Sequence, residues 1–124
     1  MSTLNAARRG LLALAALVFA SAAASAEEVT FVMNNGHPYV VEVELYSQDR
    51  DHVWPGNNQV YVLNDSETKQ IPLSCESGET ICYGAWVQGD QGTYWGVGPD
   101  NGQACENCCY TCEGGATEEI NLVE

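Results

Sequence analysis

Four cysteines lie close together near the C-terminus of this sequence, in the segment QACENCCYTCEGG. They form two adjoining Cys-x-x-Cys units, and we call Cys105, Cys108, Cys109 and Cys112 the cysteine cluster. Such thiols can be oxidised to disulfides, bind a metal ion as thiolates, or serve as a redox or nucleophilic centre. The compartment of the protein and the elements that position the sulfurs decide among these chemistries.

The first 26 residues have the features of a secretory signal peptide. A polar start carries an arginine pair, an apolar run follows, and an A-x-A cleavage site ends at Ala26. The apolar run is too short for a membrane span, which needs about 18 apolar residues. We therefore expect residues 1–26 to be cleaved and residues 27–124 to be exported, to the periplasm or the outside of the cell. The arginine pair leaves twin-arginine export open beside ordinary secretion.

Export favours disulfides, because exported thiols meet an oxidising environment. The chain has 6 cysteines, an even number that predicts three disulfides. Beside the cysteine cluster, the remaining two are Cys75 and Cys82. These two flank a short turn and could bridge each other or reach the cluster, and the sequence alone does not choose the pairing.

A thiolate metal site is the alternative use of the cysteine cluster, because two Cys-x-x-Cys units can build a tetrathiolate zinc site. Adjacent side chains of an extended chain point in opposite directions, so Cys108 and Cys109 could share one ion only around a tight bend. A redox role is less favoured than metal binding. Glu106 and Glu113 flank the cluster, and acidic neighbours raise the pKa of a thiol.

The chain is strongly acidic after the leader. Residues 27–124 have a net charge of −15, because only Arg50 and Lys69 offset the 17 acidic residues, all of which follow the leader. Polyanions should be repelled, since nucleic-acid binding is driven by basic side chains. We therefore expect no nucleic-acid partner. The carboxylates show no calcium-loop spacing and are expected to form a solvated surface.

The body of the chain predicts short strands separated by turns. In YVVEVELYS, residues 39–47, Val41, Val43 and Leu45 alternate with two glutamates, a pattern typical of a strand with one buried face. The other predicted strands of this part are 29–33, 59–64 and 68–75, and Pro72 places the last of them at a sheet edge or at a bulge. We expect an all-β, single domain: a small antiparallel β-sandwich or partly open barrel, with a disulfide-stapled, cysteine-rich C-terminal segment.

The segment ICYGAWVQGDQGTYWGVG predicts a hairpin with two distinct faces. The expected cross-strand pairs are Val87 with Thr93, Trp86 with Tyr94, Ala85 with Trp95, Gly84 with Gly96, and Tyr83 with Val97. One face, predicted to be core, holds Ile81, Tyr83, Ala85, Val87, Trp95 and Val97. The opposite face holds Cys82, Trp86, Tyr94 and a glycine floor of Gly84, Gly96 and Gly98. Either this face is an aromatic platform for a sugar or a peptide, or the cysteine-rich segment folds over it, anchored by Cys82.

These features predict a binding module and not an enzyme. The sequence has no serine elbow, no HExxH and no phosphate-binding glycine loop, and the two histidines, His37 and His52, are expected in surface loops. The candidate ligand contacts are Trp54, Trp86 and Tyr94, and the expected partner is a protein or a glycan. We expect a monomer without a cofactor, and a zinc-type thiolate protein is the alternative.

Overall fold

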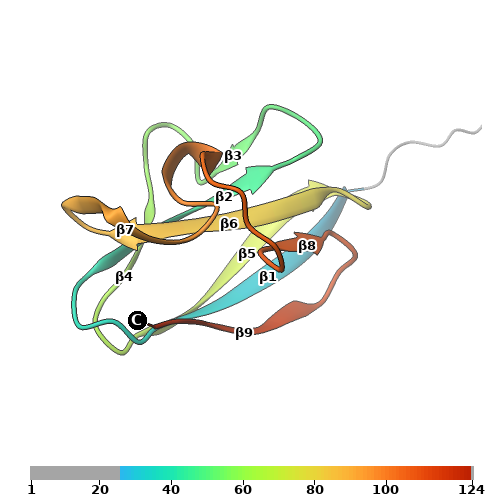
Figure 1. The fold of residues 1–124 in the computed structure, drawn as a ribbon. Helices are drawn as coiled ribbons and strands as arrows, with labels where there is room; N and C mark the ends of the chain where they lie inside the picture. Colours follow the sequence, from blue (N-terminus) through green and yellow to red (C-terminus); the bar gives the residue numbers. More distant parts are fainter. Residues whose placement is uncertain (1–25, 124) are drawn as a thin grey trace, which may run out of the picture.

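The structure, a computed structural model, describes residues 26–123, so the predicted leader lies outside the described residues apart from Ala26. Within this range the chain is nearly all β-strand (Figure 1). The elements are β1 (Ala26–Asn35), β2 (Val41–Ser47), β3 (Val53–Trp54), β4 (Tyr61–Leu63), β5 (Thr68–Glu76), β6 (Thr80–Val87), β7 (Asp90–Gly96), the 3-10 turn η2 (Pro99–Asn101), β8 (Cys109–Thr111) and β9 (Ala116–Leu122). The described range contains no helix long and apolar enough to cross a membrane.

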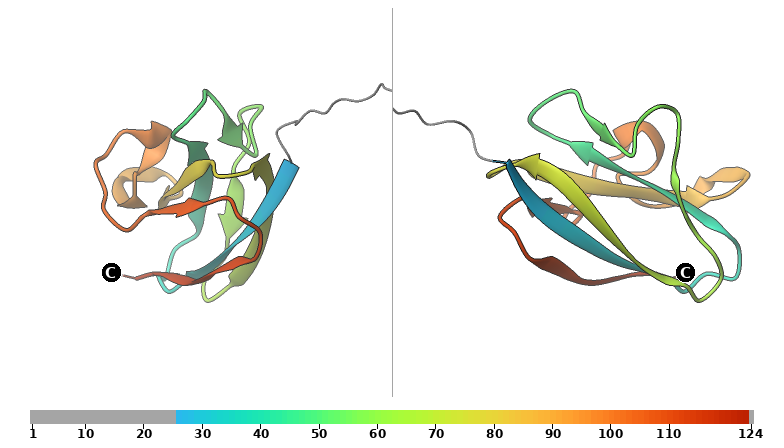
Figure 2. Two further views of the ribbon diagram at one scale, coloured as in Figure 1. Left: turned by 90° about the vertical axis from the view of Figure 1, so that its right-hand side faces the viewer. Right: turned by 180° about the vertical axis from the view of Figure 1, so that it is seen from behind.

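The strands form two sheets, which confirms the predicted all-β fold. The smaller sheet has the order β5-β1-β9, and the larger has the order β3-β2-β6-β7, with β4 also paired to β2 and β8 to β6. Figure 1 shows the two sheets as layers, and Figure 2 shows the same layers from the side and from behind. The named strand pairs are antiparallel except for β1 with β9, which run parallel.

The core lies between the layers and is built from alternate residues of the longer strands. On β2, Val41, Val43 and Leu45 are fully buried while the glutamates between them are half-buried, as the alternation predicted. β5 repeats the pattern with Ile71 and Leu73, and its place at the end of its sheet confirms the edge position expected for a proline-containing strand. Each such side chain stabilises the fold by about 1.5–3 kcal/mol relative to exposure.

The hairpin of β6 and β7 confirms most of the predicted register. Trp86 pairs with Tyr94, and the neighbouring pairs Ala85 with Trp95 and Gly84 with Gly96 also form. The pairing of Val87 was predicted wrongly, because a register shift after Trp86 places it opposite Asp90. The turn between β6 and β7 is therefore shorter than the predicted pairing of Val87 with Thr93 required.

Val97 was assigned wrongly to the main core. It packs in a second, smaller cluster with Tyr46 and Cys82, on the other side of the larger sheet. The reason is the backbone of Gly96, whose φ of 64° interrupts the alternation that would have sent Val97 inward. The strand ends at this glycine, and the chain turns over the outer face.

Candidate functional site

The structure pairs the cysteines as three disulfides. Cys75 joins Cys112, Cys82 joins Cys109, and Cys105 joins Cys108. The first links edge strand β5 to the segment after β8, and its two sulfur-bearing residues belong to the main core. The second links β6 to β8 within the larger sheet. Disulfides therefore staple the C-terminal segment onto the strands, as predicted, and the structure shows that they reach both sheets.

The four cysteines of the cluster take part in three different disulfides. Cys109 and Cys112 bond to residues of β6 and β5, while Cys105 and Cys108 bond to each other. In residues 26–123 no three His, Cys, Asp or Glu side chains are grouped as a metal ion would require. A thiolate site would thus need these disulfides to be reduced first, because the metal ligand is the thiolate.

The glycine floor is covered by the protein's own chain, and Gly98, which was predicted wrongly to belong to the floor, is part of the cover. The backbone oxygen of Gly98 lies directly against Gly84, and the Val97 N–H donates a hydrogen bond to the Tyr83 carbonyl at 2.9 Å. On the other flank the Tyr83 N–H donates to the Cys108 carbonyl at 3.1 Å. The segment after β7 therefore lies on the floor and continues to the disulfide at Cys82, which is the covering that the sequence offered as one alternative.

A methyl group at Gly84 tests this close approach. In Gly84→Ala the new carbon would collide with the Gly98 carbonyl and approach the Tyr46 ring to 2.9 Å. We expect the free energy of unfolding to fall by about 1–3 kcal/mol, the usual cost of overpacking. Urea denaturation measures the loss. The control is Gly92→Ala, where the nearest atom lies at 3.4 Å; equal stability of the two variants would mean that the floor is not tightly covered.

Two of the three predicted ligand contacts are buried. Trp86 is 3% exposed, and its indole N–H donates to the Glu42 carboxylate at 2.9 Å. Trp54 is 7% exposed and donates to the Ser74 carbonyl at 3.0 Å, so it packs on the core beneath its loop. Tyr94, in contrast, is 42% exposed. Of the three predicted contacts, Tyr94 presents the largest surface to a partner.

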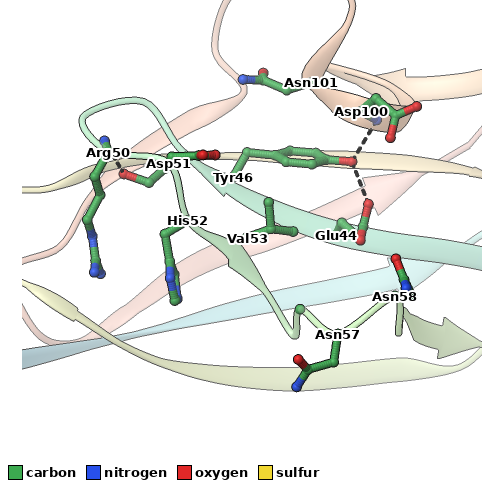
Figure 3. A pocket seen from close by; sticks show the side chains of 12 residues that line it. Glu44, Tyr46, Arg50, Asp51, His52, Val53, Asn57, Asn58, Asp100 and Asn101 are labelled. Carbon is green, nitrogen blue, oxygen red and sulfur yellow. Dashed lines mark hydrogen bonds between the residues drawn. The ribbon is translucent and has the colours of Figure 1, made fainter.

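A polar pocket of about 470 Å³ lies between the loops that follow β2, β3 and β7 (Figure 3). At its base the Tyr46 hydroxyl donates to Glu44 at 2.8 Å and accepts from the Asp100 N–H at 2.9 Å. Burial and the hydrogen bond to Glu44 raise the pKa of Tyr46, so it remains a neutral donor. Asp51, Asn57 and other polar side chains line the rim. Arg50 and His52 also line this pocket, so its polar lining carries both acidic and basic groups.

A second hollow, also about 470 Å³, is lined by His37, Thr93, Tyr94, Trp95 and Val123. The His37 ring lies 5.4 Å from the Trp95 ring and 5.4 Å from the Tyr39 ring, so Tyr39 adjoins the hollow. We call these six residues the aromatic patch. Figure 1 shows β7, the loop after β1 and the described C-terminal end at the same end of the molecule. The patch is thus assembled from three separate parts of the chain.

The aromatic patch concentrates the exposed apolar surface of the protein. The large hydrophobic side chains that are exposed in residues 26–123 are Tyr39 (65%), Val123 (53%) and Tyr94 (42%), and all three belong to it. Single exposed apolar residues are normal on a protein surface. A group of them marks an interaction site more often.

Hydrogen bonds hold both sides of the patch, and those of Asn35 are buried or partly buried. Asn35, fully buried at the end of β1, donates to the Tyr39 and Leu63 carbonyls and accepts from the His37 N–H at 2.8 Å. On the facing side the Trp95 indole donates to the Val123 carbonyl at 2.7 Å. These bonds connect each wall of the hollow to the neighbouring backbone.

Sequence analysis found Tyr94 but missed the rest of the patch. His37, assigned to a surface loop, is 6% exposed, because the Asn35 network draws its loop inward. The motif Asn-Gly-His-Pro-Tyr signals a turn, but nothing local shows that this turn meets β7 and the C-terminal strand. The chain matches no family model, no curated protein and no solved structure.

Proposed function

We propose that this protein is an exported, monomeric, non-catalytic binding module and that the aromatic patch is its contact surface. The observation that carries the proposal is that the exposed Tyr94 and Val123 line one hollow, with the exposed Tyr39 beside its His37 wall. Export is supported by the leader sequence, and three disulfides are compatible with it. A net charge of −15 after cleavage, from two basic and 17 acidic residues, favours a monomer through self-repulsion.

Binding at the patch can be tested by NMR without knowing the natural ligand. The ¹⁵N-labelled protein is titrated with neutral oligosaccharides, an uncharged peptide and tetramethylammonium. We expect at least one class to shift the amide signals of residues 93–95 and 123, because these line the hollow. No shift at these amides with any of the probes would contradict the proposal.

Tyr94→Ala is expected to weaken such binding by about tenfold or more while the fold persists, because the side chain is exposed and contributes little to the core. The affinity is measured by the same titration, and the fold by the amide spectrum. The matched control is Gln70→Ala, an exposed position on β5 in the other sheet, which should bind like the unaltered protein. Equal affinity of Tyr94→Ala and the control would remove Tyr94 from the site.

The oxidation state of the cysteines separates this proposal from a thiolate zinc protein. If the disulfides form, denaturing alkylation without reductant labels no cysteine, and the intact mass lies two hydrogens per disulfide below the reduced mass. We expect this result for protein taken from its native compartment. Alkylation of the four residues of the cysteine cluster, with zinc released on denaturation, would instead favour the metal-binding alternative.

A further inference from the structure

We infer that the ligand of the aromatic patch is a neutral glycan, bound with the C–H face of a sugar ring on Tyr94. The inference rests on the proposed contact surface and names the class of molecule that fits it. Three properties of the patch carry it: the chemistry of its lining, the area it exposes and its open shape.

The lining favours an uncharged ligand. The patch contains no Asp, Glu, Lys or Arg, although the chain holds 17 acidic residues. A bound charge would therefore find no counter-ion in the hollow itself. An anionic ligand would also be repelled by the net charge of the whole domain. A cation would be attracted by that charge and by the ring faces, and so it is the closest competitor.

The large apolar side chains of the patch expose too little area to form a stable protein interface by themselves. The exposed parts of Tyr39, Tyr94 and Val123 come to roughly 300 Å², taking a full aromatic side chain as about 200 Å². A stable protein interface buries about 800 Å² on each partner. Extending the contact beyond the patch would bring in the acidic surface. One or two sugar rings fit the smaller area better.

The open shape favours an amphipathic ligand over an apolar one. A purely apolar small molecule gains most from an enclosed pocket. Typical ligand pockets bury about 70–90% of the ligand's surface. The Tyr94 ring is partly exposed and packs against Gly98, so that a Cβ atom at Gly98 would lie 3.4 Å from the ring. We call this ring the shelf. A pyranose can place its C–H face on such a ring and leave its hydroxyl groups in water.

Polar groups at the edge of the shelf suit sugar hydroxyls. The Thr93 hydroxyl donates to Asp90 at 2.9 Å, which leaves the lone pairs of its oxygen available as acceptors. The Tyr94 and Tyr39 hydroxyls lie on exposed side chains and can both donate and accept. An aromatic shelf with hydroxyl groups at its rim therefore matches the two kinds of surface of a sugar.

The test compares ligand classes at the same amides. Four neutral oligosaccharides are used as separate probes: β-1,4-linked glucose, β-1,4-linked N-acetylglucosamine, α-1,4-linked glucose and α-1,6-linked mannose. An oligogalacturonate, tetramethylammonium and an uncharged peptide are the comparison probes. We expect at least one neutral glycan to shift the amide signals of residues 93–95 and 123. The same glycan should bind about tenfold or more tightly than the oligogalacturonate at low salt.

Two variants of Tyr94 separate ring stacking from a role in folding. Tyr94→Phe keeps the ring and should bind the glycan within about threefold of the unaltered protein, whereas Tyr94→Ala should lose about tenfold or more. If Tyr94→Ala does not fold, the shift map of the unaltered protein and the Tyr94→Phe affinity still decide. Patch shifts from the peptide or from tetramethylammonium, with none from the neutral glycans, would overturn the glycan inference and leave the contact surface standing. The absence of patch shifts from every probe would overturn both.

Discussion

Replacing Cys75 and Cys112 together by alanine is expected to lower the free energy of unfolding by about 4 kcal/mol. The disulfide joins residues 37 apart. On the chain-entropy model, closing a loop of that length lowers the conformational entropy of the unfolded state and destabilises that state by about this amount. It also ties edge strand β5 to the segment that leads from the larger sheet into β9. Because a whole domain is stable by only about 5–15 kcal/mol, the variant should be partly unfolded at warm temperatures.

Guanidinium denaturation of the oxidised proteins measures this loss, and alanine avoids leaving a buried hydroxyl group unpaired. The matched control replaces Cys105 and Cys108, which are 3 apart in sequence and lie in the outer covering segment. The same chain-entropy argument gives about 2 kcal/mol for so short a loop. Equal losses in the two double variants, or a larger loss in the control, would show that loop length does not govern stability here.

The sequence predicted the parts of the fold that depend on local pattern. Alternation identified the buried face of β2, and the turn and apolar pattern gave the central register of the β6 and β7 hairpin. An even number of cysteines in a small domain with a leader predicted three disulfides. Such signals are independent of the topology. One face of a half-buried strand must be apolar, and oxidised cysteines must pair, whichever strands are neighbours.

Long-range pairing could not be predicted in the same way. β9 has the alternating residues Ile120 and Leu122, yet its parallel pairing with β1 joins the two ends of the domain, and no local pattern specifies that partner. The aromatic patch depends on this pairing, because it brings Val123 to the Trp95 indole. The disulfide partners follow from the same arrangement. Tyr94 alone was visible in the sequence because its hairpin is local.

The second large effect concerns an ion pair between a partly exposed arginine and a buried carboxylate, which sequence analysis did not identify. Glu79, whose side chain is 1% exposed, accepts hydrogen bonds from Nε and Nη2 of Arg50 and from the Glu76 N–H. Arg50 lies in the loop after β2, and Glu79 lies in the turn between β5 and β6. The pair therefore joins the two sheets through their connecting loops.

Replacing Arg50 by methionine should lower the free energy of unfolding at pH 7 by more than the control variant below does, because it leaves the Glu79 carboxylate without its counter-ion. Methionine retains much of the apolar length of the side chain. Adding Glu79→Gln should recover part of the loss, since the amide carries no charge, and the double-mutant cycle isolates the interaction. The control is Lys69→Met, which breaks the more exposed pair with Glu67 at 3.9 Å and should change stability by less than about 1 kcal/mol.

The ion pair also gives a specific dependence on pH. The hydrogen bonds from Arg50 lower the pKa of Glu79 to about 2, below the ordinary value of 4.5 that it regains on unfolding. A carboxyl group with a depressed pKa stabilises the folded state fully above its unfolded pKa, and this contribution is lost as the pH falls through the folded value. The difference in stability between the unaltered protein and Arg50→Met should therefore shrink as the pH falls from about 4.5 towards about 2. Urea denaturation at several pH values measures the difference, and a gap that stays constant over this range would show that Glu79 is not the carboxylate that Arg50 stabilises.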